Sequence, residues 1–256
     1  MLNVDLTGKV AVITGSSRGI GKGIALIYAQ AGAKVVVSSR TVSACDEVVE
    51  EIKAAGGDAI AVACDIVSKP DCANLIDSAR KAFGKVDILV CNAALNPWYG
   101  SLIDLPDETY DLCMNANVRS PWWLIQMVFP EMKERRDGSI ILISSGAGMF
   151  GLETLGLYGM SKAAEMQLAR NIAVEGGPHN VRANVIAPGL IDTDFAAPVK
   201  ALPDMYNAIM AGIPLRRIGT VEEVAGAALF LASDLGTFMN GHTMCCDGGT
   251  TIYHAG

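Results

Sequence analysis

VAVITGSSRGIG, residues 10–21, is the stretch of this 256-residue chain that decides its fold. Its first five residues, Val10–Thr14, are mostly β-branched and predict a buried strand. The glycines that follow, spaced G-x-x-x-G-x-G, allow a tight turn into a helix and let the backbone approach a pyrophosphate. Such a turn can be purely structural, but between a first strand and a first helix it predicts a dinucleotide site. The expected contacts are Gly15, Ser17, Arg18, Gly19, Ile20 and Gly21.

Short β-branched runs alternate along the whole chain with longer segments whose apolar residues recur every three or four positions. The expected strands are Val10–Thr14, Lys34–Ser38, Ala59–Ala63, Val86–Cys91, Ser139–Ser144, Val181–Ala187 and Thr243–Cys246. The expected helices are Gly19–Ala31, Ser43–Ala55, Lys69–Phe83, Asp107–Arg135, Leu155–Gly176 and Val221–Ser233, with C-caps at Gly32, Gly56-Gly57, Gly84 and Gly176-Gly177. Nearly all-hydrophobic strands joined by helices predict an α/β fold: a Rossmann-like, doubly wound, seven-stranded parallel sheet with helices on both faces, in a single domain over residues 1–256.

Composition excludes several classes of function. The net charge is −7 and no Lys/Arg cluster exceeds Arg135-Arg136, so a nucleic-acid partner is not expected. No stretch approaches the roughly 20 apolar residues that span a bilayer, and no signal peptide is visible, so neither a membrane partner nor secretion is expected. The seven cysteines are odd in number and lie in apolar segments, which is typical of reduced thiols in a cytoplasmic protein. With three histidines and no paired ligand spacing, no metal site is expected.

The end of the second strand predicts which dinucleotide binds. An NAD site is expected to carry Asp or Glu there, for the adenosine ribose hydroxyls, but the chain reads Ser38-Ser39-Arg40 and has no acid before Asp46. Arg40, together with Arg18, can hold a 2′-phosphate by charge-assisted, forked hydrogen bonds. We therefore expect NADP(H); the alternative is that both arginines are solvated loop residues.

A pair of residues that follows the third expected strand, Asp65 and Ile66, completes the expected adenosine site. Asp65 is placed to accept a hydrogen bond from the adenine amino group, with Ile66 beside it. An Asp that caps a helix or faces solvent has the same appearance in the sequence, so both interpretations stay open.

Tyr158-Gly-Met-Ser-Lys162 predicts the chemistry, because residues at i and i+4 share one helix face. A phenol has an ordinary pKa of about 10, and a neighbouring ammonium favours its ionised form. Tyr158 beside Lys162 is therefore a candidate general acid/base at neutral pH. By itself the spacing is more often that of two surface neighbours.

Two further residues fit around this pair. Ser145, at the carboxyl end of the fifth expected strand, can donate to a carbonyl oxygen held next to the tyrosine, since ligands of open α/β sheets bind outside the strand ends. Ser144 competes for this role, but alternation along a strand directs only one of the two into the site. Asn117, in the long central helix, can hold a water that relays protons to Lys162.

Taken together, these features closely resemble the classical short-chain dehydrogenase/reductase superfamily over almost the whole chain. The matching features are Thr14–Gly21, Asp65, Cys91-Asn92-Ala93-Ala94, Asn117, Ser145, Tyr158-x-x-x-Lys162, Pro188-Gly189 with Thr193, and Asp247-Gly248-Gly249. The resemblance implies a catalytic tetrad of Asn117, Ser145, Tyr158 and Lys162. It also implies that Lys162 binds the nicotinamide ribose and that Thr193 and the Ile191 backbone hold the carboxamide.

One motif departs from the family pattern. The fourth strand usually ends in Asn-Asn-Ala-Gly, whereas here it ends in Cys91-Asn92-Ala93-Ala94. Asn92 matches the second Asn of the motif, so the backbone role of that Asn should be kept. Ala94 replaces the final Gly, and its methyl group narrows the space that Gly would leave open for close approach. Within the superfamily, Ser38-Ser39-Arg40 and Asn92–Pro97 are also similar to the vertebrate NADP-dependent retinol and carbonyl reductases.

The substrate side is expected to be apolar. Three segments should surround the nicotinamide, residues 95–100, 146–156 and 190–214, and residues 190–217 resemble a lid in which Pro203 and Pro214 bracket a short helix. The alternative is that the aromatic residues of these three segments pack the loops against the rest of the domain and do not line a pocket. The candidate pocket residues are Trp98, Met149, Phe150 and Phe195.

The sequence therefore favours an oxidoreductase that moves a hydride between NADP(H) and a secondary alcohol or carbonyl. One alternative is 3-oxoacyl-carrier-protein reduction, which an acidic chain disfavours because carrier proteins are acidic. Another is a catalytically idle dinucleotide-binding sensor or structural subunit, although the tetrad is intact. The apolar run Pro121–Phe129 on the central helix predicts a homotetramer, or at least a dimer.

Overall fold

The computed structural model describes residues 4–196 and 201–253. Its centre is a seven-stranded sheet in the order β3-β2-β1-β4-β5-β6-β7, in which each neighbouring pair is parallel. The strands are β1 (Val10–Thr14), β2 (Lys34–Ser39), β3 (Asp58–Ala63), β4 (Ile88–Cys91), β5 (Gly138–Ile143), β6 (Val181–Pro188) and β7 (Thr243–Cys246). All seven expected strands are confirmed, with ends within two residues of those expected.

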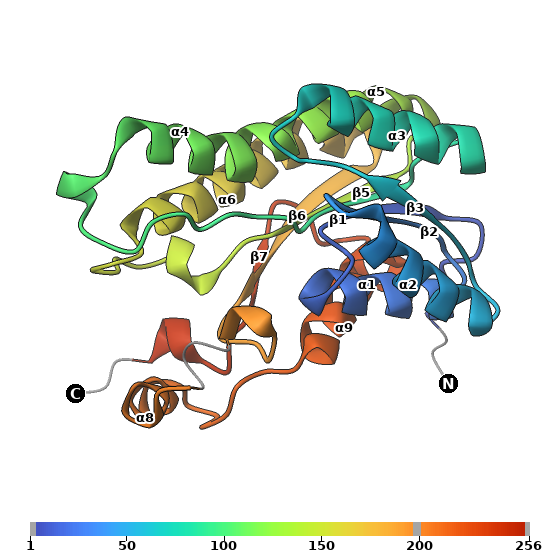
Figure 1. Cartoon of the computed structure of the whole chain (residues 1–256). Coiled ribbons are helices and arrows are strands. Elements are labelled where there is room, and N and C mark those ends of the chain that lie inside the picture. The colour runs from blue at the N-terminus through green and yellow to red at the C-terminus, as the bar shows by residue number, and fades with distance from the viewer. Residues whose placement is uncertain (1–3, 197–200, 254–256) are drawn as a thin grey trace.

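Helices cover both faces of the sheet, as Figure 1 shows: α3, α5 and α6 lie on one side, and α1, α2 and α9 on the other. The described helices are α1 (Gly19–Gln30), α2 (Val42–Ala54), α3 (Lys69–Phe83), α4 (Asp107–Met114), α5 (Ser120–Arg135), α6 (Gly156–Gly176), α8 (Pro203–Gly212) and α9 (Val221–Ala232). The Rossmann-like, doubly wound architecture is therefore confirmed.

Two apolar cores follow from the alternation of side chains along the strands. Val12 and Val36 join the core under α3, α5 and α6, whereas Ile13 and Val37 join the core under α1, α2 and α9. These four side chains are fully buried, and each such burial contributes roughly 1.5–3 kcal/mol. This two-sided burial explains why the strands read as continuous hydrophobic runs.

The prediction of one continuous helix over Asp107–Arg135 is wrong, because the helix is interrupted near its middle. The chain forms α4, then a five-residue π-helical segment, Asn115–Arg119, and then α5. Pro121 supplies a physical reason, because it has no N–H to donate to the carbonyl of Asn117 as an α-helix requires. The break places Asn117 in the π-helical segment.

The glycine C-caps are confirmed in three of four places. Gly32, Gly56 and Gly84 have φ values of +92°, +85° and +85°, the left-handed region that ends helices. The cap expected at Gly176-Gly177 is wrong, because the chain continues into a 3₁₀ turn and Asn180 takes the left-handed conformation at φ 58°. Asn tolerates this region, and its side chain donates to the carbonyl of Arg136 at 2.9 Å.

The carboxyl ends of the strands face one edge of the molecule, and the strand order reverses between β1 and β4. Ligands of open α/β sheets bind at such a switch point. Within the described ranges no helix is long and apolar enough to cross a membrane. Nor do the described residues contain a group of three or more His, Cys, Asp or Glu side chains that could hold a metal ion.

Candidate active site

The turn after β1 packs so closely that its glycines leave no room for side chains. Gly15 has φ +65°, and a Cβ on Gly21 would lie 2.3 Å from the Gly15 carbonyl oxygen and 2.6 Å from Nδ2 of Asn92. Helix α1 begins in this turn, and its N-cap residue, Arg18, makes no side-chain capping hydrogen bond. The first N–H groups of α1 therefore have no side-chain cap, an arrangement that suits a pyrophosphate.

Asn92 ties this turn to the end of β4. Its Nδ2 donates to the carbonyl oxygens of Thr14 at 2.9 Å and Gly15 at 3.0 Å. The backbone N–H groups of Asn92 and Ala93 donate to Oγ1 of Thr14 at 3.0 and 3.1 Å. The Asn92 side chain thus positions the turn. Ala94, the residue at which the chain departs from the family pattern, is exposed.

Both arginines expected at the 2′-phosphate are exposed. Arg40 follows β2 and makes no hydrogen bond or ion pair with any described residue. Arg18 pairs with Asp194 at 3.4 Å, but the two side chains are 78% and 80% exposed, and such pairs contribute little. The turn is fixed against β2 because the N–H of Ser38 donates to Oγ of Ser16 at 2.9 Å. Two cations therefore remain available to an anion at this edge.

Asp65 is half-buried, lies two residues beyond the end of β3 and does not cap a helix. The N-cap of α3 is Ser68, whose hydroxyl accepts from the Asp71 N–H at 3.3 Å. Asp65 Oδ1 accepts from the Val67 N–H at 3.2 Å, whereas its Oδ2 meets no donor among the described residues. Ile66 beside it is buried. One of the two interpretations of Asp65, the helix cap, is therefore excluded.

The carboxyl end of β5 and the start of α6 bring three tetrad residues together. Lys162 Nζ lies 5.5 Å from the centre of the Tyr158 ring. Of the two serines after β5, Ser144 is buried and donates to the Lys162 carbonyl at 2.8 Å, whereas a hydrogen bond from Ser145 lowers the pKa of Tyr158. Ser145 is thus the serine that faces the phenol.

The pKa of the Tyr158 phenol is shifted in the opposite direction from the one that the sequence predicts. Burial has the largest effect and raises the pKa of Tyr158, while Lys162 and Ser145 lower it and Glu165 raises it. The overall direction is upward, although the sequence, with Lys162 alone in view, predicts a lowered pKa. Burial and a nearby carboxylate outweigh the ammonium.

Glu165 is the residue that the sequence analysis missed. Lys162 Nζ donates to its Oε1 at 2.8 Å and Oε2 at 3.0 Å, and to the Ile143 carbonyl at 3.0 Å. The two side chains are only 1% and 2% exposed. A signal was present: Tyr158, Lys162 and Glu165 occupy positions i, i+4 and i+7, one face of the helix.

Asn117 is buried and its side-chain amide is fully engaged. Oδ1 accepts from the Leu95 N–H at 2.8 Å, and Nδ2 donates to the Leu95 carbonyl at 2.8 Å and the Ser161 hydroxyl at 2.9 Å. The amide therefore contacts the residue next to Lys162 and not Lys162 itself. Pro121 has no N–H, so the Asn117 carbonyl lacks the donor that it would have in a regular α-helix.

The end of β6 and the residues that follow it, 188–193, run beside the glycine turn. A Cβ on Gly19 would lie 3.3 Å from Cγ2 of Thr193. Ile191 is buried, and its carbonyl accepts from Thr193 Oγ1 at 3.4 Å. The residues expected at the pyrophosphate and at the carboxamide are thus neighbours.

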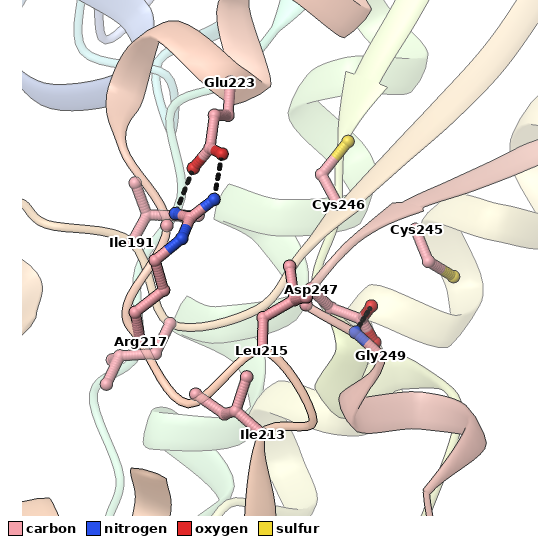
Figure 2. Close-up of a pocket in the computed structure, with 12 residues that line it drawn as sticks. Ile191, Ile213, Leu215, Arg217, Glu223, Cys245, Cys246, Asp247 and Gly249 are labelled. Atoms are coloured by element: carbon pink, nitrogen blue, oxygen red, sulfur yellow. Dashed lines mark hydrogen bonds and ion pairs between the residues drawn. The ribbon is translucent and has the colours of Figure 1, made fainter.

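Two cavities adjoin the site. One, of about 480 Å³, lies between the segment Leu190–Ile191, residues 213–219 and the end of β7. Figure 2 shows Arg217 and Glu223 joined across its wall by hydrogen bonds of 2.8 and 2.5 Å. The other, of about 420 Å³, lies between the loop after β5 and the start of α6. Neither cavity is lined by Asn117, Ser145, Tyr158 or Lys162, the residues of the expected tetrad.

The expected pocket residues fall in different places. Met149 and Phe150 line the second cavity and are 48% and 43% exposed. Trp98 folds onto its own loop, where Nε1 donates to the Ser101 carbonyl at 3.1 Å. The Phe195 side chain lies outside the described part of the chain, as do residues 197–200 of the expected lid. The structure thus brings Met149 and Phe150 together in one cavity, and Trp98 contacts residues of its own loop.

Comparison with known proteins gives one consistent result. The family model described as enoyl-(acyl carrier protein) reductase matches residues 15–251. Dehydrogenase/reductase SDR family member 4 of Bos taurus is 40% identical over 245 residues, which is 96% of this chain and 88% of that protein.

Solved structures agree with this. A short-chain type dehydrogenase/reductase from Mycobacterium ulcerans has a TM-score of 0.94 at 29% identity, covering 98% of this chain and 93% of that one. A 7α-hydroxysteroid dehydrogenase complexed with NADH and 7-oxo glycochenodeoxycholic acid has a TM-score of 0.92 at 40% identity, covering 96% of each chain. The chain therefore belongs to the classical short-chain dehydrogenase/reductase superfamily.

Proposed function

We propose that this chain is an NADP(H)-dependent oxidoreductase that interconverts a secondary alcohol and a carbonyl in a predominantly apolar substrate. The observation that carries the proposal is the meeting of Ser145, Tyr158 and Lys162 at the same sheet edge as a glycine turn with no room for side chains. The turn suits a dinucleotide, and the three side chains suit proton transfer to a carbonyl oxygen.

The residues present fit the cofactor. Gly15 and Gly21 allow the tight turn into α1, and the first N–H groups of α1 have no side-chain cap that competes with a pyrophosphate. Arg40 and Arg18 support NADP over NAD, since both are exposed and neither is firmly paired. The steroid dehydrogenase to which the chain is similar holds NADH, so the choice between the two cofactors is part of the test.

The proposed mechanism assigns one role to each tetrad residue. When bound, the nicotinamide supplies or accepts the hydride. In the reductive direction Tyr158 donates its phenolic proton to the carbonyl oxygen, and the Ser145 hydroxyl donates a hydrogen bond to the same oxygen. Lys162 stabilises the resulting phenolate and binds the ribose, and the Asn117 main-chain carbonyl holds a water that returns a proton through Lys162.

The apolar substrate side rests on Met149 and Phe150, whose exposed side chains share one cavity with no charged residue in its lining. We further propose that residues 190–217 act as a lid within a single domain, with α8 as its helical part. Trp98 and Phe195 complete the proposed pocket.

A second candidate function has one observation in its favour. The matching family model is described as an enoyl-(acyl carrier protein) reductase, so acyl thioesters, including 3-oxoacyl groups on a carrier protein, are the competing substrates. The net charge of −7 disfavours an acidic carrier protein.

We also propose a homotetramer. Trp122 on α5 is 44% exposed, Val174 on α6 is 78% exposed and Phe238 before β7 is 102% exposed. Pairing of subunits across α5 and α6 covers the apolar surface at Trp122 and Val174. Light scattering at micromolar concentration should give about four times the chain mass, and a monomer contradicts the proposal. A cytoplasmic location is proposed from the cysteines, all seven of which are free thiols.

One experiment tests the proposed function. The purified protein is given NADPH or NADH with a panel of aromatic ketones, aliphatic diketones, retinoids, 7-oxosteroids and acyl thioesters, and cofactor oxidation is followed at 340 nm. We expect turnover of an apolar ketone with NADPH. Turnover of acyl thioesters alone supports the second candidate, and dinucleotide binding without any turnover supports the idle sensor.

A further inference from the structure

Lys162 and Glu165 form an ion pair that is closed to solvent. The ammonium and the carboxylate are joined by two contacts of 2.8 and 3.0 Å, and their side chains are 1% and 2% exposed. A third contact, of 3.0 Å, joins Nζ to the Ile143 carbonyl at the end of β5. An ammonium has three donors, so these contacts use all of them.

Because both oxygens of one carboxylate contact Nζ, Lys162 can lose one of these contacts and stay paired with Glu165. Lys162 can exchange one Glu165 oxygen for a ribose hydroxyl while the other oxygen and the Ile143 carbonyl keep Nζ in place. Without Glu165, a single carbonyl would hold a charged group in the interior. An unpaired buried ammonium is strongly disfavoured and loses its proton instead.

The groups around the pair leave Glu165 as the sole counter-charge among the described residues. On α6, Tyr158 has a raised pKa and is therefore neutral near pH 7. Cys91 on β4 and Cys113 on α4 also act on the pair, but burial raises the pKa of both thiols. Burial lowers the pKa of Lys162, yet Glu165 and Tyr158 together leave it raised.

We propose that Glu165 is a positioning residue for Lys162: it keeps the ammonium charged and fixed at the end of β5, where ribose and phenol need it. The inference rests on the proposed dinucleotide-dependent function. It adds a residue that acts through Lys162 and touches neither cofactor nor substrate.

Removal of the carboxylate charge has a predictable sign. In Glu165→Gln the burial of Lys162 is no longer opposed by a negative charge, so the pKa of Lys162 falls. The ammonium is then present below the lowered pKa and lost above it. Both NADPH affinity and kcat should decrease as pH rises, by up to about tenfold for each pH unit above that pKa.

The experiment measures the NADPH dissociation constant by fluorescence and kcat on the best ketone, from pH 6 to pH 9.5. Burial raises the pKa of Glu165 to about 7, so wild type should keep a nearly flat NADPH affinity from about pH 8 to pH 9.5, where the carboxylate is charged. Glu165→Gln should lose at least about tenfold between its low-pH plateau and pH 9.5. Glu165→Asp keeps the charge and should restore most of the wild-type profile. Glu175→Gln, the same change at an exposed position of α6, should match wild type.

The possible outcomes separate the two proposals. If wild type binds neither NADPH nor NADH, the proposed function fails. If wild type binds NADPH and Glu165→Gln lowers affinity or kcat by a constant factor at every pH, Glu165 is only a structural residue and the inference is overturned. Should Glu165→Gln not fold, Glu165→Met also leaves Lys162 unpaired and must show the same pH-dependent loss; a profile parallel to wild type overturns the inference equally.

Discussion

A methyl group on Gly21 should damage both the stability of the protein and its cofactor site. The Cβ of Gly21→Ala would lie 2.3 Å from the Gly15 carbonyl oxygen and 2.6 Å from Asn92 Nδ2, far inside van der Waals contact. These atoms cannot both move without weakening the 2.9 and 3.0 Å hydrogen bonds from Asn92 to Thr14 and Gly15. Overpacking costs about 1–3 kcal/mol, which for a chain of this size lowers Tm by roughly 2–12 °C.

Gly21→Ala should also weaken NADPH binding, because the turn forms part of the proposed cofactor site. Each ~1.4 kcal/mol of lost contact weakens NADPH tenfold, and a displaced turn also misdirects the N–H groups of α1. The assay is thermal unfolding by circular dichroism at fixed protein concentration, followed by NADPH titration through Trp fluorescence.

Gly226→Ala is the matched control. Gly226 lies on the exposed side of α9, and a Cβ there meets no atom within 4 Å. The added methyl should stabilise the helix by about 0.5–1 kcal/mol. If Gly21→Ala keeps both the Tm and the NADPH affinity of wild type, the close packing of the turn is not a requirement and the reasoning is refuted.

Three further changes have defined outcomes. Arg40→Ser should weaken NADPH by at least about tenfold and leave NADH unchanged, since a charge-assisted contact contributes roughly 1.5–3 kcal/mol; equal losses for both cofactors in titrations contradict the 2′-phosphate role. Lys162→Ala should reduce both kcat and NADPH affinity, and a loss in only one of them contradicts its double role. Hydrogen bonds from Arg217 and the Thr220 N–H lower the pKa of Glu223 from 4.5 to about 2, so its stabilisation is present above pH 4.5 and lost toward pH 2. Glu223→Gln should therefore show a smaller fall of Tm between pH 5 and pH 2, and parallel curves speak against the ion pair.

Local patterns were enough to predict most of the fold. β1 and α3 match their expected bounds, because one is a mostly β-branched run and the other has apolar residues at helical spacing between Ser68 and Gly84. The central helix was harder, since its hydrophobic period continues through a π-helical segment that depends on hydrogen-bond register. Pro121 was the available signal for that break.

The site was predictable in its parts and less so in its electrostatics. The sequence places Tyr158 beside Lys162, but it does not show how deeply both are buried, and burial sets the direction of the phenol pKa. The pairing of Lys162 with Glu165 inside the protein was missed for the same reason, because an acid on a helix is ordinarily solvated. Asp194 meets Arg18 across 176 residues of sequence, a contact that no local pattern contains.

The phenol of Tyr158 is the centre of the proposed mechanism, and Tyr158→Phe tests it most directly. The measurement is kcat for NADPH-dependent reduction of the best ketone from the panel, together with the NADPH dissociation constant. Loss of the general acid should lower kcat by about 10²–10⁴-fold, whereas NADPH affinity should stay close to wild type. Near-normal carbonyl reduction by Tyr158→Phe would contradict the account.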